Sequence, residues 1–141
     1  MRDARGRMTI RRSHLLLLVA IATTFALSLP RRASASVVFI SQEDDGREFT
    51  LDRGDALEIS LPATSGTGYT WQAEPVAAGF VKQVGEPAFT FDSAMPGASG
   101  RETFHFSVEA SGTGTLEMRY LRPWEKGMKP AKVFKTMLIV H

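Results

Sequence analysis

From Val37 onward the chain consists of short segments in which apolar and polar residues alternate, separated by clusters of turn-forming residues. A repeat of two residues is typical of β-strands that bury one face, whereas amphipathic helices repeat every 3.6 residues. Strands at this spacing predict an all-β fold, an antiparallel β-sandwich of about eight strands. The segments with strand character are Val37–Ser41, Glu48–Leu51, Ala56–Leu61, Tyr69–Ala73, Phe80–Val84, Ala88–Asp92, Glu102–Glu109, Thr115–Leu121 and Val133–Val140.

The same alternation predicts which side chains face the core, because successive side chains of a strand point to opposite faces of its sheet. Turn-forming residues lie between the segments. We interpret Asp44–Gly46 as a hairpin turn, and Arg53–Gly54 and Ser111–Gly114 as tight turns. The positions predicted to face inward are Leu57, Ile59, Leu61, Phe104, Phe106, Val108, Leu116, Met118 and Tyr120.

The first 35 residues have a different character. A basic start that includes Arg11-Arg12 is followed by an apolar run from Leu15 to Leu29, which is shorter than the roughly 20 residues that a membrane-spanning helix needs. Ala33-Ser34-Ala35 then supplies the small side chains that signal peptidases accept. We therefore expect a signal peptide over residues 1–35 and, after its removal, one domain of residues 36–141 that is periplasmic or secreted. An uncleaved membrane anchor fits the short run less well.

The export route stays open, because the arginine pair is typical of twin-arginine signals while His14 stands where such signals prefer an apolar residue. The chain contains no cysteine, which excludes a bacterial lipoprotein anchor, thiol nucleophiles and thiolate metal sites. It also means that the domain is stabilised by packing rather than by disulfides.

The leader also dominates the overall charge. It carries seven of the 17 Lys and Arg residues but one of the 15 Asp and Glu residues, so residues 36–141 hold ten basic and fourteen acidic residues, a net charge of −4. The basic character of the whole chain is therefore no sign of nucleic-acid binding. We expect a monomer that binds neither nucleic acid nor, once the leader is removed, a membrane.

No catalytic arrangement is recognisable in the predicted domain. Its two histidines, His105 and His141, lie on the outward face of a strand and at the last residue, outside any nucleophile or metal motif. Asp44–Gly46 lacks the alternating acidic positions and the closing glutamate of a calcium-binding EF-hand loop. The sequence therefore predicts no metal, no cofactor and no enzymatic activity.

Three connecting segments contain residue types that favour binding, and binding residues concentrate in loops held by a rigid scaffold. In the first, glycines precede an aromatic pair. In the second, the residues are small and uncharged. In the third, an arginine, a proline and a large aromatic residue follow one another. The candidate binding residues are Thr64, Ser65, Gly66, Thr67, Gly68 and Tyr69 in the first, Gly97, Ala98, Ser99 and Gly100 in the second, and Arg122, Pro123 and Trp124 in the third.

Ordinary structural roles are also open to these residues. Trp71 is expected in the core, and Trp124 either packs back onto the sandwich or stays exposed to bind a partner. The segment Ser93–Gly100 would serve as a plain linker, or its tip would approach another chain. If the three segments share one end of the sandwich, they form a single binding surface.

Taken together, these residues resemble the chagasin-type inhibitors of papain-like cysteine peptidases. The resemblance rests on Gly68-Tyr69-x-Trp71, on a glycine-rich segment before Thr103-Phe104-x-Phe106, and on Tyr120-x-Arg122-Pro123-Trp124. It covers essentially all of residues 36–141. It implies an immunoglobulin-like β-sandwich whose three loops enter the active-site cleft of a papain-like cysteine peptidase and block it reversibly. The first loop would lie over the catalytic cysteine, with the other two beside it.

The sequence departs from the family pattern at two places. The first loop of the family is typically Asn-Pro-Thr-Thr-Gly-Tyr, whereas the matching positions Thr64–Tyr69 agree in their last three residues. Gly66 replaces a threonine that is expected to lie against the catalytic cysteine, so a polar contact is lost. The Gly-x-Gly-Gly of the second loop becomes Gly97-Ala98-Ser99-Gly100. The target peptidase and the affinity stay open, and the alternative function is a non-inhibitory immunoglobulin-like binding module of the cell envelope.

Overall fold

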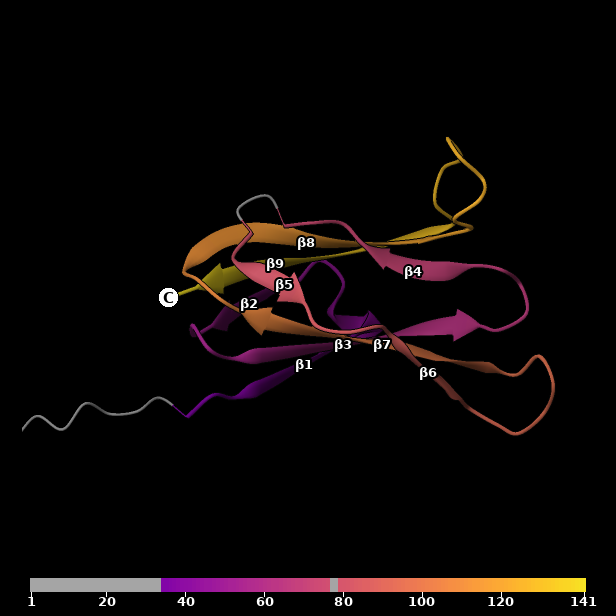
Figure 1. Ribbon diagram of the computed structural model, residues 1–141, viewed down its shortest axis with the longest axis horizontal. Helices are drawn as coiled ribbons and strands as arrows, with labels where there is room; N and C mark the ends of the chain where they lie inside the picture. The colour runs from indigo at the N-terminus through magenta and orange to yellow at the C-terminus, as the bar shows by residue number, and fades with distance from the viewer. Residues whose placement is uncertain (1–33, 77–78) are drawn as a thin grey trace, which may run out of the picture. The chain divides into compact units, whose positions relative to one another are not determined.

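The computed structural model describes residues 34–76 and 79–141, so residues 1–33 of the predicted signal peptide lie outside the described residues. Within these ranges the chain forms nine strands and one turn of 3₁₀ helix (Figure 1). No described helix is long and apolar enough to span a membrane. The elements are β1 (Val37–Ser41), η1 (Gln42–Asp44), β2 (Glu48–Leu51), β3 (Ala56–Thr64), β4 (Thr70–Ala73), β5 (Val81–Gln83), β6 (Ala88–Phe91), β7 (Ser99–Val108), β8 (Gly112–Leu121) and β9 (Lys132–Val140).

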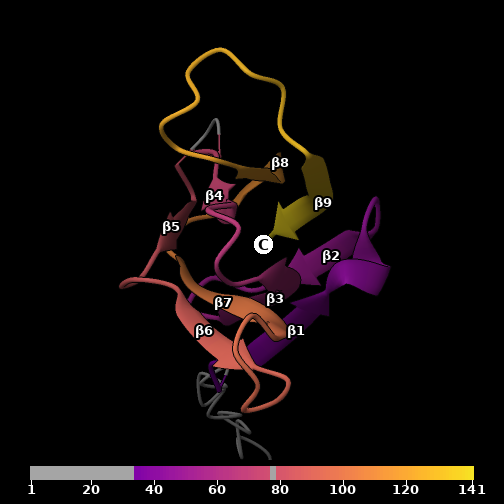
Figure 2. The ribbon, with the colours of Figure 1, turned by 90° about the vertical axis from the view of Figure 1, so that its right-hand side faces the viewer.

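The strands form two sheets that pack face to face (Figure 2). One sheet has the order β1-β3-β7-β5, with β6 pairing with the first part of β7 and β5 with its last part, and the other has the order β2-β9-β8-β4. The predicted all-β, immunoglobulin-like sandwich is confirmed, with nine strands rather than about eight. The description of it as antiparallel is wrong in part, because β1 runs parallel to β3 and β2 runs parallel to β9.

The two parallel pairs arise from the segment that joins β1 to β2. These consecutive strands belong to different sheets, so η1 and the turn after it carry the chain from one sheet to the other. The predicted hairpin turn at Asp44–Gly46 is therefore wrong. The Asp44 carboxylate instead holds the start of this crossing, since it accepts a hydrogen bond of 2.9 Å from the backbone N–H of Ser41.

The predicted core positions are confirmed. All nine inward-facing residues predicted on β3, β7 and β8 are buried, and Trp71 is buried with them as expected. The predicted turn at Ser111–Gly114 is wrong, because β8 begins at Gly112. A Cβ atom at Gly112 would lie 2.8 Å from the ring of Phe80. This glycine therefore makes room for a core phenylalanine rather than for a turn.

Asp55 supports the end of the sandwich where the carboxyl terminus lies (Figure 1). Its nearly buried carboxylate accepts hydrogen bonds of 2.8 Å from the backbone N–H groups of Ser36 and Asp52. These two bonds, the one from Ser36 first, hold the pKa of Asp55 below its ordinary value of 3.8. The ionised carboxylate is therefore the form that stabilises the folded chain.

We expect Asp55→Asn to lower the free energy of unfolding by about 1–2 kcal/mol at neutral pH, because charge-assisted hydrogen bonds become neutral ones. A carboxyl group with a lowered folded-state pKa stabilises the fold above its unfolded pKa and loses this effect as the pH falls through the folded value. The difference between Asp55→Asn and wild type should therefore shrink below about pH 3.8. Urea denaturation at several pH values measures this. Asp92→Asn, which removes the same charge at an exposed aspartate, is the matched control.

Candidate functional site

The three predicted segments lie at one end of the sandwich, opposite the carboxyl terminus (Figure 1). We define loop 1 as residues 65–69 between β3 and β4, loop 2 as residues 92–98 between β6 and β7, and loop 3 as residues 122–131 between β8 and β9. Loop 1 lies between the other two when this end is viewed directly (Figure 2). Ser65 Oγ of loop 1 donates a hydrogen bond of 3.5 Å to the carbonyl oxygen of Ala98 in loop 2. The condition for a single binding surface is therefore met.

Loop 1 is held in shape by bonds within itself. The hydroxyl of Thr67 donates to the carbonyl oxygen of Thr64 at 2.8 Å and accepts from the backbone N–H of Tyr69 at 3.4 Å. Gly66 and Gly68 both have a φ near +80°, a conformation that side-chain-bearing residues rarely adopt. The loop is thus a formed turn, and its threonine hydroxyl is directed into the loop rather than toward a partner.

Arg122 joins loop 3 to loop 1. Its Nε donates to the carbonyl oxygen of Thr67 at 3.1 Å, and its guanidinium lies 4.5 Å from the centre of the Tyr69 ring. Tyr69 in turn stacks on Tyr120, with ring centres 5.3 Å apart, and Tyr120 packs against Trp71 at 5.0 Å. A continuous stack therefore connects the surface of loop 3 to the core, and each stacked pair adds to the energy of simple burial.

Trp124 leans on loop 1 without entering the core. A Cβ atom added to Gly68 would lie 2.8 Å from Cζ2 of the Trp124 indole, so the ring rests directly on the glycine backbone. Even so, 65% of the surface of Trp124 is exposed. Of the two roles open to this residue, the structure favours the exposed one, because the tryptophan is positioned by one edge and leaves most of its ring to solvent.

Loop 2 differs from the predicted segment. Ser99 and Gly100 are the first residues of β7 rather than part of the loop, and Gly100 is buried opposite Ala63. A Cβ atom at Gly100 would overlap the backbone carbonyl oxygen of Thr90 and lie 2.7 Å from the Phe89 ring, so this glycine makes room for the close packing of β6. Gly97, with a φ of 74°, does lie at the turn of the loop.

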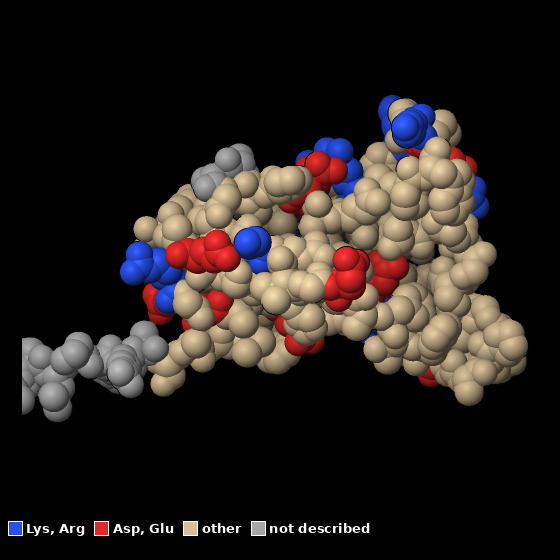
Figure 3. All heavy atoms as spheres, in the orientation of Figure 1, with Lys and Arg blue, Asp and Glu red and all other residues tan. Residues whose placement is uncertain are grey.

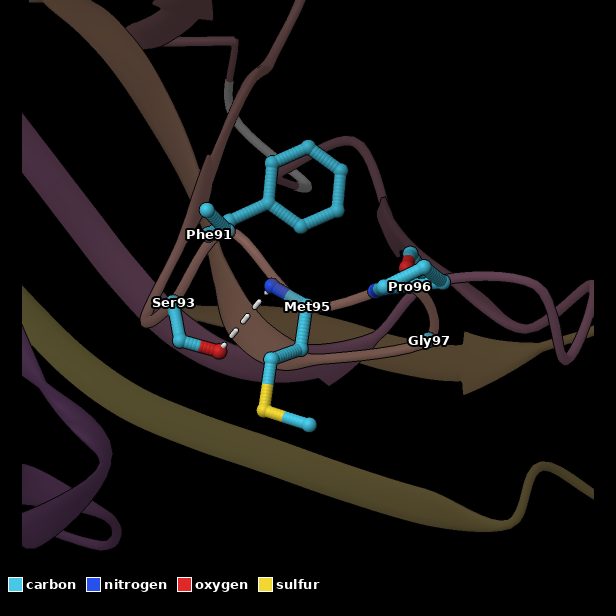
Figure 4. Close-up of a pocket in the computed structure, with 7 residues that line it drawn as sticks. Phe91, Ser93, Met95, Pro96 and Gly97 are labelled. Atoms are coloured by element: carbon cyan, nitrogen blue, oxygen red, sulfur yellow. Dashed lines mark hydrogen bonds between the residues drawn. The ribbon is translucent and has the colours of Figure 1, made fainter.

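Loop 2 and its flanking strand expose two apolar side chains that were not predicted from the sequence. Met95 is 72% exposed and Phe91 is 56% exposed. Figure 4 shows the Met95 side chain pointing away from the Phe91 ring, with the backbone N–H of Met95 bonded to Ser93 Oγ at 3.4 Å. Ser65, Phe91 and residues 93–97 of loop 2 line an open hollow of about 560 Å³. A methionine before a proline in the uncharged segment Ser93–Gly100 is the signal that the sequence offered.

A buried carboxylate lies beneath loop 1. Glu102 of β7 accepts hydrogen bonds from the backbone N–H of Trp71 at 2.7 Å and from the hydroxyl of Thr70 at 2.9 Å. These are the first two residues of β4, which belongs to the other sheet. The alternation along β7 already placed Glu102 on the inward face, two residues before Phe104, and this was the available sign of its role.

A comparison with models of known families now identifies the chain. Residues 50–137 match the model of the Chagasin family peptidase inhibitor I42. The chain belongs to the chagasin family of peptidase inhibitors. The resemblance inferred from the three motifs is therefore confirmed, and so is the prediction that the chain is not an enzyme, because this family consists of inhibitors.

Two relatives and a solved structure agree with this assignment. The chain is 34% identical to chagasin of Trypanosoma cruzi over 92 residues, which cover 60% of this chain and 81% of that protein. It is 25% identical to amoebiasin-2 of Entamoeba histolytica over 108 residues, which cover 76% of this chain and 88% of the relative. The crystal structure of the cysteine protease inhibitor EhICP2 from Entamoeba histolytica has the same fold, with a TM-score of 0.66, 20% identity, and coverage of 76% and 97%.

Most of the residues predicted for binding in this chagasin-family chain lie in the three loops. Loop 1 contains Ser65 to Tyr69, loop 2 contains Gly97 and Ala98, and loop 3 contains Arg122, Pro123 and Trp124. Thr64 is the last residue of β3, and its backbone N–H donates to the hydroxyl of Tyr120 at 3.1 Å. Thr64, Ser99 and Gly100 therefore lie in the strands that carry the loops.

The contact between loops 1 and 3 predicts different outcomes for two similar glycines. Gly68→Ala should displace the Trp124 indole, because the new Cβ atom would overlap the ring, whereas Gly66→Ala meets no atom within 4 Å. The backbone strain of about 1 kcal/mol is common to both, since their φ angles are 79° and 77°. The nuclear magnetic resonance signal of the Trp124 indole N–H measures the displacement. An equal shift of this signal in both variants would contradict the contact.

Proposed function

We propose that this chain is a reversible inhibitor of papain-like cysteine peptidases that blocks the active-site cleft with loops 1, 2 and 3. The observation that carries the proposal is the joining of loops 1 and 3, in which Arg122 bonds to Thr67 and Trp124 rests on Gly68. Loops that are already ordered lose less conformational entropy on binding, so a modest interface can bind tightly. Inhibition of this kind needs no catalytic group, metal or cofactor.

In this proposal loop 1 lies over the catalytic cysteine of the peptidase. Gly66 stands where the family has threonine, and its Cβ position is open to solvent. The hydroxyl of Thr67 is bonded within the loop. The groups that loop 1 offers to the cleft are therefore chiefly backbone atoms around Gly66 and Gly68, while Trp124 would pack on one cleft wall and loop 2 on the other.

The decisive test is competitive inhibition of papain-like peptidases by the purified protein, for which we expect inhibition constants in the nanomolar range. Absence of inhibition at micromolar concentration throughout a panel of such enzymes would contradict the proposal. Capture of envelope proteins other than peptidases, without inhibition, would favour the alternative of a non-inhibitory binding module.

Trp124→Ala should weaken inhibition by about 2 kcal/mol, roughly 30-fold in the inhibition constant, because large aromatic residues carry much of the energy of interfaces. Phe39→Ala is the matched control. Phe39 lies on β1 rather than in the three loops and is 67% exposed, close to the 65% of Trp124. Inhibition constants for both variants measure the difference, and an unchanged constant for Trp124→Ala would remove this residue from the interface.

We also propose that the inhibitor acts in the periplasm or outside the cell after loss of residues 1–35. The position of the first hydrogen bonds of the domain supports this cleavage site. Ser36 already bonds to Asp55 and Ala56, and β1 begins at Val37, so cleavage after Ala35 leaves the sheet intact. Extracytoplasmic peptidases would then be the accessible targets.

Expression of the full chain in a bacterial host should yield an exported protein whose first residue is Ser36, as measured by mass spectrometry. Ala35→Arg should prevent cleavage, because signal peptidases require a small residue immediately before the cut. Ser34→Arg, between the two small residues, is the control and should still be processed. A mature protein that retains the leader would contradict this part of the proposal.

A further inference from the structure

We call the end of the sandwich that carries loops 1, 2 and 3, which is proposed to contact the peptidase, the binding end. Positive charge is concentrated at one side of it. We define the basic segment as residues 122–132, which comprise loop 3 and the first residue of β9. It contains four basic residues and one acidic residue, a net charge of +3. The other residues of the 36–141 domain include six basic and thirteen acidic residues, a net charge of −7. The domain is thus strongly polarised, although its net charge is small.

The outward charge of the basic segment belongs to its lysines. Arg122 bonds to Glu125 at 3.1 Å and faces the Tyr69 ring, so its charge is largely engaged within the molecule. The exposed lysines are Lys126, Lys129 and Lys132, and none of them forms an ion pair with a described acidic residue. Basic side chains gather at the outer end of loop 3 (Figure 3). Lys132 Nζ lies 5.6 Å from the centre of the Tyr120 ring, so the ammonium groups that remain available to a partner are those of Lys126 and Lys129.

The other two loops do not share this charge. Loop 1 contains no ionisable acid or base apart from the Tyr69 phenol, and loop 2 contains Asp92 as its single charged residue. Loop 2 instead presents the exposed side chain of Met95, and Phe91 at the end of β6 is exposed as well. The surface is therefore basic on one side and mainly uncharged and apolar on the other. It fits a partner whose surface is acidic opposite loop 3 and mainly uncharged opposite loops 1 and 2.

We propose that the basic segment recognises papain-like peptidases whose cleft has an acidic rim on the side that meets loop 3. This inference rests on the proposed function and specifies which members of the target class are bound fastest. An acidic rim attracts the lysines and repels the remainder of the domain, so the inhibitor approaches with its binding end forward. The lysines act before contact is made, because charges are felt over about 8 Å at physiological ionic strength.

The effect is expected chiefly in the association rate, because charges at the edge of an interface steer encounter more than they hold the finished complex together. Trp124 and loop 1 supply the contacts that resist dissociation. Loss of the lysines should therefore slow binding to acidic-rimmed peptidases without abolishing inhibition. The lysines are thus distinguished from Trp124 and loop 1, because they affect the association rate rather than the dissociation rate.

The test compares two double variants with the same change of charge. Lys126→Glu/Lys129→Glu alters the basic segment, and Arg53→Glu/Lys82→Glu alters exposed residues outside the three loops. Arg53 lies beside the carboxyl terminus, where its backbone N–H bonds to His141. Stopped-flow measurements give association and dissociation rates of the purified proteins with papain-like peptidases of known structure, chosen to differ in the number of acidic residues around the cleft.

At low ionic strength the loop 3 variant should associate with acidic-rimmed peptidases about 10-fold more slowly than wild type, with little change in dissociation. The control variant should be slowed much less. At about 1 M salt, where charges are felt over about 3 Å, the difference should largely disappear. Equal rates for wild type and the loop 3 variant, equal slowing by the control, or rates unrelated to rim acidity would each overturn the inference while leaving the proposed function intact. Failure of wild type to inhibit any peptidase would overturn both.

Discussion

The binding end depends on the hydrogen bonds that the Glu102 carboxylate accepts from β4. The two sheets contact each other mainly through apolar side chains. Such packing fixes the distance between the sheets more strictly than it fixes how far one sheet is shifted along the strands of the other. Glu102 of one sheet accepts two hydrogen bonds from the beginning of β4 in the other, at the point where loop 1 ends. The Trp71 indole then donates to the carbonyl oxygen of Pro62 at 3.0 Å, on the strand that precedes the loop. Both ends of loop 1 are thus fixed, and Arg122 and Trp124 of loop 3 pack on loop 1.

The strands and the core could be predicted from the sequence because they follow from local alternation. Leu57, Phe104 and Leu116 lie on strands with an apolar residue at every second position. Such a strand has one apolar face, and that face is the one it buries. Strand partners do not follow from local pattern. Nothing in the residues of β1 distinguishes a parallel neighbour from an antiparallel one, and the pairing with β3 depends on where the chain crosses between sheets.

For the binding end, motifs identified the loops but not their internal contacts. The family pattern pointed to Gly68, Arg122 and Trp124. The packing of Trp124 on the Gly68 backbone could not be predicted, because the two loops are far apart in sequence and their contact is visible only in the folded structure. Glycine-rich composition was misleading in the second segment. Gly100 is small because the Thr90 carbonyl oxygen and the Phe89 ring lie against it, so a packing requirement was taken for part of a binding loop.

The unequal coupling of the three loops bears on how inhibitors of this kind diversify. Loops 1 and 3 share the Arg122–Thr67 bond, the Arg122–Tyr69 stack and the Trp124–Gly68 contact, so a change in one demands a compensating change in the other. Among the described residues, the hydrogen bond between loop 2 and loop 1 is the long one of 3.5 Å from Ser65 Oγ to the carbonyl oxygen of Ala98. Natural variation and laboratory retargeting can therefore proceed through loop 2 one substitution at a time, whereas the paired loops must evolve together.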